Sequence, residues 1–390
     1  RNVAIGFQAL TTDTVGSRSV AMGHNALSVQ NFTTATDSFN TAVGHEAGAA
    51  VTTGISNTLL GGAAGDAFTD ADNNVAIGFA ALSGDTLGSK SVAIGKAALN
   101  NQNFTTATDS FNVAIGTEAG LSVTTGVKNT LIGGNSGDAL TDADFNVAVG
   151  NGSLSSDTLG SHSVALGHFA LRSQNHTTAT DAYNVAVGSQ AGTSVTTGVN
   201  NTLIGSIAGD AITTANSIVA VGYSAAGNIT TGSNNVAVGQ NALASSRTDT
   251  SNVAVGHESL LTLNGGGLNT AMGFQSGRSM TTGVDNTLIG GLAGSGITTG
   301  DNNTFVGSDT GLTAVTGDVN TAVGYGAGQV ITSGSSNTCV GDRAGFSLTT
   351  GSNNLFLGHD AGRSGSPGGQ FAASSNTMVL GDENISQCFI

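Results

Sequence analysis

Three polar stretches of this chain each carry a pair of rings seven residues apart, which could bind a ligand. They read QNFTTATDSFN from residue 30, QNFTTATDSFN from 102 and QNHTTATDAYN from 174. Aromatic rings on a polar loop suit the faces of sugars, and loops often carry function. The candidate ligand-binding residues are Phe32, Phe39, Phe104, Phe111, His176 and Tyr183. Alternatively, the second ring of each pair caps a hydrophobic core and the segment only thickens the molecule.

A second candidate chemistry is metal binding by histidine, the commonest metal ligand among side chains. Five of the seven histidines directly follow a recurrent glycine: His24, His45, His168, His257 and His359. Around a three-fold axis, three equal histidines could hold an ion. In other repeats the same position holds Phe, Gly, Lys, Thr or Tyr, which is typical of a variable exposed turn. We therefore expect no metal and no cofactor.

Catalytic motifs do not stand out from the periodic background. The chain has no nucleophile-elbow pattern, and its acidic residues mostly recur in register with the repeat. A glycosidase pair of carboxylates that lie far apart in sequence stays open as an alternative. We expect a protein that is not an enzyme.

Composition excludes several classes of partner. The net charge is −15 with only 10 Lys and Arg, so a groove that tracks phosphates is not expected and neither is nucleic acid. No apolar run approaches the length of a membrane span, so we expect no membrane insertion. There are 60 Gly and one Pro in 390 residues, yet 38% of residues are hydrophobic. Such a chain can bury apolar surface if it does so repetitively.

The candidate residues sit on a regular repeat. A glycine that follows an apolar triplet, called here the anchor glycine, occurs 22 times, and most of these glycines follow the previous one at a 17-residue interval. Three longer intervals carry the stretches described above, as between Gly95 and Gly116. The repeat divides the chain into three 72-residue blocks over residues 1–217, regular 17-residue units over 218–364 and an irregular C-terminal junction over 365–390.

Each unit predicts one coil of a parallel β-solenoid. A run of β-branched residues between Asn or Ser and the anchor glycine indicates a short strand, and a later VTTG or ITTG run indicates a second one. A single coil cannot bury its own apolar face, so coils must stack on one another. At a strand spacing of about 4.8 Å, 22 coils would make a rod of roughly 100 Å.

The strand residues alternate between two faces. The residues three and one before the anchor glycine share a face, which we expect to line the core. The residue two before it is Ala in most units and Leu or Phe in others, such as Leu131, Leu203 and Leu288. This second column is too apolar to face water in 22 copies, so we expect it to pack against other subunits.

Units such as RSVAMGHNAL from residue 18, KSVAIGKAAL from 90 and HSVALGHFAL from 162 resemble the YadA-like heads of trimeric autotransporter adhesins. The strings NTLIGGLAG, NTAVGYGAG and NTMVLGDENISQCFI are also similar to repeat regions of viral tail fibres, in which a chaperone domain follows the array. The resemblance covers nearly the whole chain. It implies a left-handed parallel β-roll with three chains side by side.

These similarities define the expected function. We expect an all-β, homotrimeric, elongated fibre of about 22 coils. It would lie outside the cell on a virion surface and attach to a host glycan or receptor. The alternatives are a bacterial trimeric adhesin head on the cell surface and an extracellular filament with no ligand.

Overall fold

The computed structural model describes residues 1–363 and 371–382, and over these residues the chain is a parallel β-solenoid. It folds as two compact units, residues 1–199 and 200–390. Among the described residues, no helix could cross a membrane. Most of the junction predicted at 365–390 lies outside the described residues.

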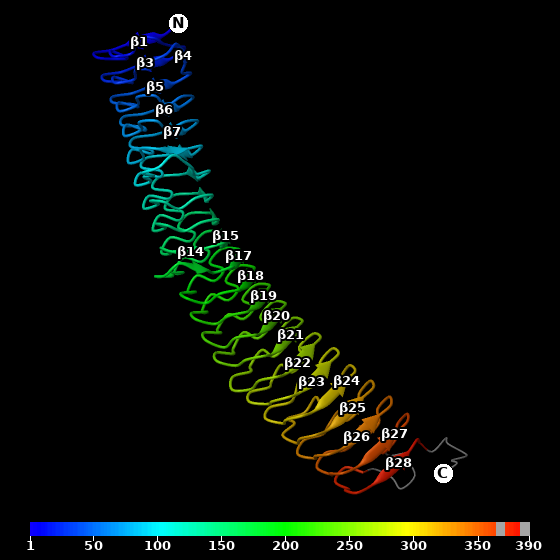
Figure 1. Cartoon of the computed structure of the whole chain (residues 1–390). Coiled ribbons are helices and arrows are strands. Elements are labelled where there is room, and N and C mark those ends of the chain that lie inside the picture. The colour runs from blue at the N-terminus through cyan, green and yellow to red at the C-terminus, as the bar shows by residue number, and fades with distance from the viewer. Residues whose placement is uncertain (364–370, 383–390) are drawn as a thin grey trace. The chain divides into compact units, whose positions relative to one another are not determined.

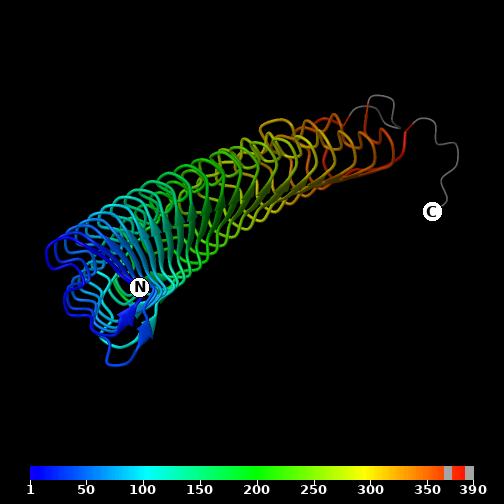
Figure 2. The same cartoon turned by 90° about the horizontal axis from the view of Figure 1, so that it is seen from above.

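One three-residue strand precedes every anchor glycine. Within each unit the strands of successive coils lie side by side (Figures 1 and 2). In the first unit these strands are β1 (Val3–Ile5), β3 (Val20–Met22), β5 (Thr41–Val43), β6 (Thr58–Leu60), β7 (Val75–Ile77), β9 (Val92–Ile94), β11 (Val113–Ile115), β12 (Thr130–Ile132), β13 (Val147–Val149), β15 (Val164–Leu166) and β17 (Val185–Val187). In the second unit they are β18 (Thr202–Ile204), β19 (Val219–Val221), β20 (Val236–Val238), β21 (Val253–Val255), β22 (Thr270–Met272), β23 (Thr287–Ile289), β24 (Thr304–Val306), β25 (Thr321–Val323), β26 (Thr338–Val340), β27 (Leu355–Leu357) and β28 (Met378–Leu380). The two-residue strands are β2 (Gly16–Ser17), β4 (Thr36–Asp37), β8 (Gly88–Ser89), β10 (Thr108–Asp109), β14 (Gly160–Ser161) and β16 (Thr180–Asp181).

Equivalent residues of successive coils pair with one another. Val236 of β20 pairs with Val253 of β21, one 17-residue repeat later. The three ring-bearing stretches that lengthen the interval between anchor glycines are called here the inserts. The register still holds across an insert, as in the pairing of Val92 with Val113. Each repeat is therefore one coil, and the additional residues are accommodated outside the strand. This confirms the predicted β-solenoid.

The anchor glycines are required by both conformation and space. Gly167 has φ of +140°, which residues with a side chain rarely adopt. A Cβ atom placed on it would lie 2.3 Å from the carbonyl oxygen of Gly188 in the next coil. Glycine therefore recurs at this position because the coils approach each other through it.

The second predicted strand does not form. In the VTTG run that starts at Val123 the residues make bends, although the Thr124 amide still donates to the Thr141 carbonyl of the next coil at 2.9 Å. The Val123 side chain is buried, so the run closes the coil interior without forming a strand. Over residues 1–363 and 371–382, the one bridge in such a run joins Ile297 to Val315.

The asparagines at the start of the strands form buried ladders. The Asn112 side-chain oxygen accepts from the Asn129 amide at 2.9 Å, and the Asn129 oxygen accepts from the Asn146 amide at 3.0 Å. Asn129 Nδ2 also donates across the coil to the Ala143 carbonyl at 2.7 Å. These bonds satisfy backbone groups that would otherwise be buried without partners, so the asparagine repeats for a structural reason.

The strand faces are the reverse of the sequence expectation. In every three-residue strand after β1 the central residue is buried, and its two neighbours are half-buried or exposed. Leu131, Leu203 and Leu288 are all fully buried within one chain. The prediction that this column packs against other subunits is therefore wrong. It lines the coil interior, where most coils have Ala and others have Leu or Phe, and is called here the core column.

Asp66 and Asp138 lie five residues after the anchor glycines Gly61 and Gly133 of the first unit and are half-buried. One oxygen of each carboxyl is buried without a hydrogen-bond partner among the described residues. Desolvation raises the pKa of both groups above the usual 3.8, and the charges of Glu46 and Glu118 respectively add to this. A raised pKa in the folded state favours the protonated form. These carboxyls therefore lower the free energy of unfolding at neutral pH. The destabilisation disappears as the pH falls below their raised pKa values, because both carboxyls are then protonated.

We predict that the double variant Asp66→Asn, Asp138→Asn is more stable than the parent at about pH 7, by less than about 1 kcal/mol per site. The gain should disappear near about pH 3, where the parent carboxyls carry protons. Denaturant unfolding at both pH values measures the difference. An equal gain at both pH values would assign the effect to packing and not to charge.

Candidate functional site

The three inserts pair with the coil that precedes each of them. Strand β4 pairs in parallel with β2, β10 with β8, and β16 with β14. Between each insert's first ring and its short strand lie three exposed residues, at 33–35, 105–107 and 177–179. The insert is therefore fastened at its base and exposed at its tip.

The first ring of each insert packs inside the protein. Phe32, Phe104 and His176 are each only 5% exposed. A Cβ atom on Gly16, Gly88 or Gly160 of the preceding coil would lie within 2.8 Å of the respective ring, so only glycine leaves room for the ring. Such rings cannot offer a face to a sugar. Of the six candidate residues, Phe32, Phe104 and His176 therefore have a packing role.

A buried carboxylate holds the start of the second insert. Asp85 Oδ2 accepts from Gln102 Nε2 at 2.6 Å, and its Oδ1 accepts from the Phe104 amide at 3.1 Å and the Gly88 amide at 3.0 Å. Asp157 makes the same three bonds in the third insert. Sequence reasoning missed these residues, although an Asp three positions before a Gly recurs at the same place in every block and could have identified them.

The second ring of each insert points outward. Phe39, Phe111 and Tyr183 are each about half exposed, at 51%, 49% and 52%. Their φ angles lie close to +50°, in the left-handed region. The alternative in which the second ring caps the core does not agree with this exposure. These three are the sequence candidates that a ligand can reach.

Each exposed ring belongs to a group of three residues, which we call an insert trio. The first trio is Arg18, Asp37 and Phe39. Arg18 Nε lies 3.2 Å from Asp37 Oδ1, and the guanidinium carbon lies 5.2 Å from the Phe39 ring centroid. The Arg18 side chain is thus held between a carboxylate and an aromatic face.

The arrangement recurs in the next two blocks. In the second trio Lys90 Nζ lies 2.5 Å from Asp109 Oδ2 and 5.2 Å from the Phe111 centroid. In the third trio His162 Nδ1 lies 3.1 Å from Asp181 Oδ1, and its ring centroid lies 5.1 Å from that of Tyr183. The basic member was not identified from the sequence because it comes from the preceding coil and not from the insert itself.

Phe145 and Lys128 extend the third trio. They stand two residues before a three-residue strand, as His162 and Tyr183 do, and this repeat position is called here the corner. Phe145 stacks on His162 with centroids 4.9 Å apart, and Lys128 Nζ lies 4.8 Å from the Phe145 centroid. Much of each ring face is therefore covered by the neighbouring coil. What this surface offers is ring edges, carboxylate oxygens and basic groups. Such groups suit a polar ligand rich in hydroxyl groups better than a flat apolar one.

Basic side chains are rare in this acidic chain, so their presence in and beside the trios is distinctive. Only 10 Lys and Arg occur in 390 residues, and Arg18, Lys90 and Lys128 all lie on this corner.

The chain matches no protein-family model and no curated protein sequence. Over its described residues the chain is thus a parallel β-solenoid that carries three equivalent surface trios.

Proposed function

We propose that the chain is part of a homotrimeric fibre that attaches a virus particle to a host surface. The observation that carries this proposal is a largely apolar sheet face, which a single chain leaves half-buried or exposed. The residue directly before each anchor glycine is always Ile, Val, Leu or Met, and it points away from the core. We call this column, with the outward residue two positions earlier, the outward face.

An open face of this kind favours association. Burial of apolar surface contributes about 25 cal/mol for each Å² removed from water, and a continuous apolar patch usually marks an interface. The outward face repeats once per coil with the same spacing in every copy of the chain. Parallel copies could therefore match coil against coil. Closed symmetry with three copies, as the resemblance to trimeric fibres implies, would cover the face in all of them.

Assembly is tested with three consecutive outward residues. We expect the variant Ile94→Asp, Ile115→Asp, Ile132→Asp to sediment as a monomer while the parent sediments as a trimer, because three carboxylates per chain would face each other across the interface. The matched control places three Asp at exposed insert positions, Thr33→Asp, Thr105→Asp and Thr177→Asp, and should remain trimeric.

Sedimentation velocity distinguishes the outcomes. A parent that is monomeric at all concentrations would exclude the proposed trimer. A trimeric outward variant would mean that the subunits meet through a different surface. Loss of the trimer in both variants would point to a general effect of added charge.

Attachment is assigned to the insert trios. They recur every four coils, which is about 19 Å along the first unit at normal strand spacing. Weak single sites at that interval gain from avidity if a repetitive surface polymer spans them. A host-surface glycan of repeating units fits the exposed rings, carboxylates and basic groups of the trios.

We predict that the variant Phe39→Ala, Phe111→Ala, Tyr183→Ala binds host-surface glycan at least about tenfold more weakly than the parent, with an unchanged melting temperature. The control removes exposed rings outside the trios, by Phe79→Ala, Tyr223→Ala and Phe274→Ala, and should bind normally. Binding is measured on immobilised glycans and on host cells. Full binding by the trio variant would move the receptor site elsewhere, and a trimeric parent that binds no surface would favour a purely structural filament.

A further inference from the structure

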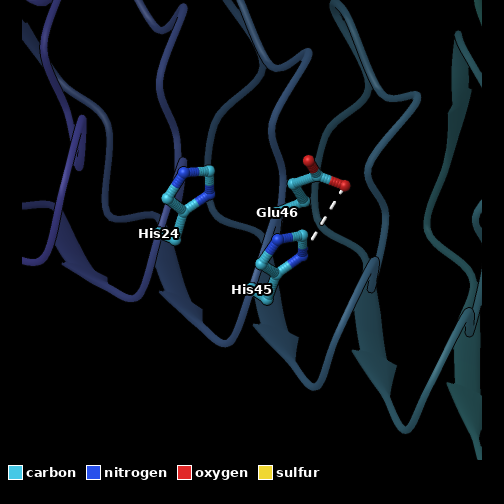
Figure 3. Close-up of side chains that lie close together, drawn as sticks. All are labelled: His24, His45 and Glu46. Atoms are coloured by element: carbon cyan, nitrogen blue, oxygen red, sulfur yellow. Dashed lines mark ion pairs between the residues drawn. The ribbon is translucent and has the colours of Figure 1, made fainter.

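Two histidines of the first unit lie one above the other. His24 and His45 follow the anchor glycines of consecutive coils, and their rings are stacked with centroids 5.1 Å apart and planes 7° apart (Figure 3). The other face of His24 stacks on Phe7 at 5.5 Å. Within the described residues, this is the one place where two histidines meet at this position of the repeat.

Glu46 completes the group. Its φ of +59° is left-handed, and its amide donates to the His24 carbonyl at 2.8 Å, which ties the turn to the coil before it. Its side chain returns beside His45, with Oε2 3.6 Å from Nδ1. One ligand atom from each of His24, His45 and Glu46 lies within 4.8 Å of the other two.

We propose that His24, His45 and Glu46 bind a divalent transition-metal ion of the zinc class. Two imidazole nitrogens and a carboxylate oxygen suit zinc, with the remaining position open to water. Imidazole ligands favour Zn²⁺, Ni²⁺ or Cu²⁺ over Ca²⁺ and Mg²⁺, which take oxygen ligands. This contradicts the expectation of no metal from the sequence. There the histidines were considered as equal positions on three chains and not as neighbours in one chain.

Binding requires only local side-chain movement. Zinc ligands lie about 2.0 to 2.2 Å from the ion, so the stacked rings must turn toward each other. The side chains of His45 and Glu46 are 63% and 42% exposed, which leaves room for this rotation. The ion replaces the pairing of His45 with Glu46 and joins two adjacent coils. Because it binds the folded state, it raises the stability of the first unit.

The proposal is tested by titrating the full chain with ZnCl₂ in a calorimeter. We expect one ion per chain and a higher melting temperature with zinc. His24→Ala or His45→Ala should weaken binding at least about tenfold, because each removes a ligand. Glu46→Gln should also weaken it. His168→Ala and His257→Ala are matched controls from the same repeat position and should bind as the parent does.

Other outcomes would overturn the site. Equal loss in the His168 and His257 variants, or several ions per chain, would indicate scattered surface histidines. Competition by excess Ca²⁺ would indicate a carboxylate site. A parent that takes up no zinc would exclude it directly. Melting curves without metal show whether each variant is folded, so failure to bind is not mistaken for failure to fold.

Discussion

Gly290→Ala is expected to unfold the coils around it, with a loss of more than about 3 kcal/mol in the free energy of unfolding. Gly290 has φ of +135°, a region that is costly for alanine. The new Cβ would lie 2.5 Å from the Gly307 carbonyl oxygen. That oxygen belongs to backbone, and the Gly307 amide is bonded to the Ile289 carbonyl at 2.8 Å, so the neighbouring coil cannot move away without losing its own contacts.

The adjacent residue is a matched control for this prediction. Gly291 does not have positive φ, and its added Cβ would meet only Ser308 Oγ, at 3.8 Å. Gly291→Ala should therefore be neutral or stabilising by up to about 1 kcal/mol, since alanine restricts the unfolded chain. Denaturant unfolding followed by circular dichroism compares the two. Equal effects at Gly290 and Gly291 would show that the anchor glycine is not required by close approach.

The second large effect is expected from Leu288→Asp. Leu288 is fully buried, with its methyl groups near Gly277 and Gly294. A carboxylate at this position would have no partner in the core, so we expect a loss of more than about 4 kcal/mol and a unit that no longer folds. The neighbouring residue Ile289 is 39% exposed and points outward.

Ile289→Asp is the control, and its effect on a single chain should be below about 1 kcal/mol because the new carboxylate stays hydrated. The comparison is made by thermal melting and limited proteolysis at a protein concentration low enough to keep chains apart. If Ile289→Asp unfolds the chain and Leu288→Asp does not, the faces are assigned the wrong way round and the core column is the surface that packs against other subunits.

The repeat in the sequence was sufficient to predict the class of fold and the register of its strands. Regular spacing of the anchor glycines means that each coil must repeat the shape of the last one, and the pairing of Val236 with Val253 follows from that spacing. The positions of Asn and Gly were also informative, because a buried amide ladder admits few residue types and a φ near +135°, as at Gly290, is suited to glycine. Local chemistry decides these features, so they can be recognised without coordinates.

Only the tertiary structure decided which face of each strand points into the core. Both faces of the strand are apolar, so alternation between them does not show which one is inside. The column of Ala, with Leu or Phe in some coils, lies inside, while the Ile and Val side chains on either side of it are left half-buried or exposed. The VTTG run likewise supplies a buried Val without the backbone geometry of a strand, which residue preferences alone cannot reveal.

The candidate sites depended on contacts between coils. Phe32 and Phe39 lie on the same insert and have similar side chains, yet the glycine of the preceding coil buries one and Arg18 of that coil contacts the other. His24 and His45 belong to different repeats, and only the stacking of their coils brings the rings together. The sequence by itself determined that coils stack in register. The tertiary structure decided which side chains then meet. The path of each coil between its strands, with its insertions and turns, sets the direction in which each side chain points.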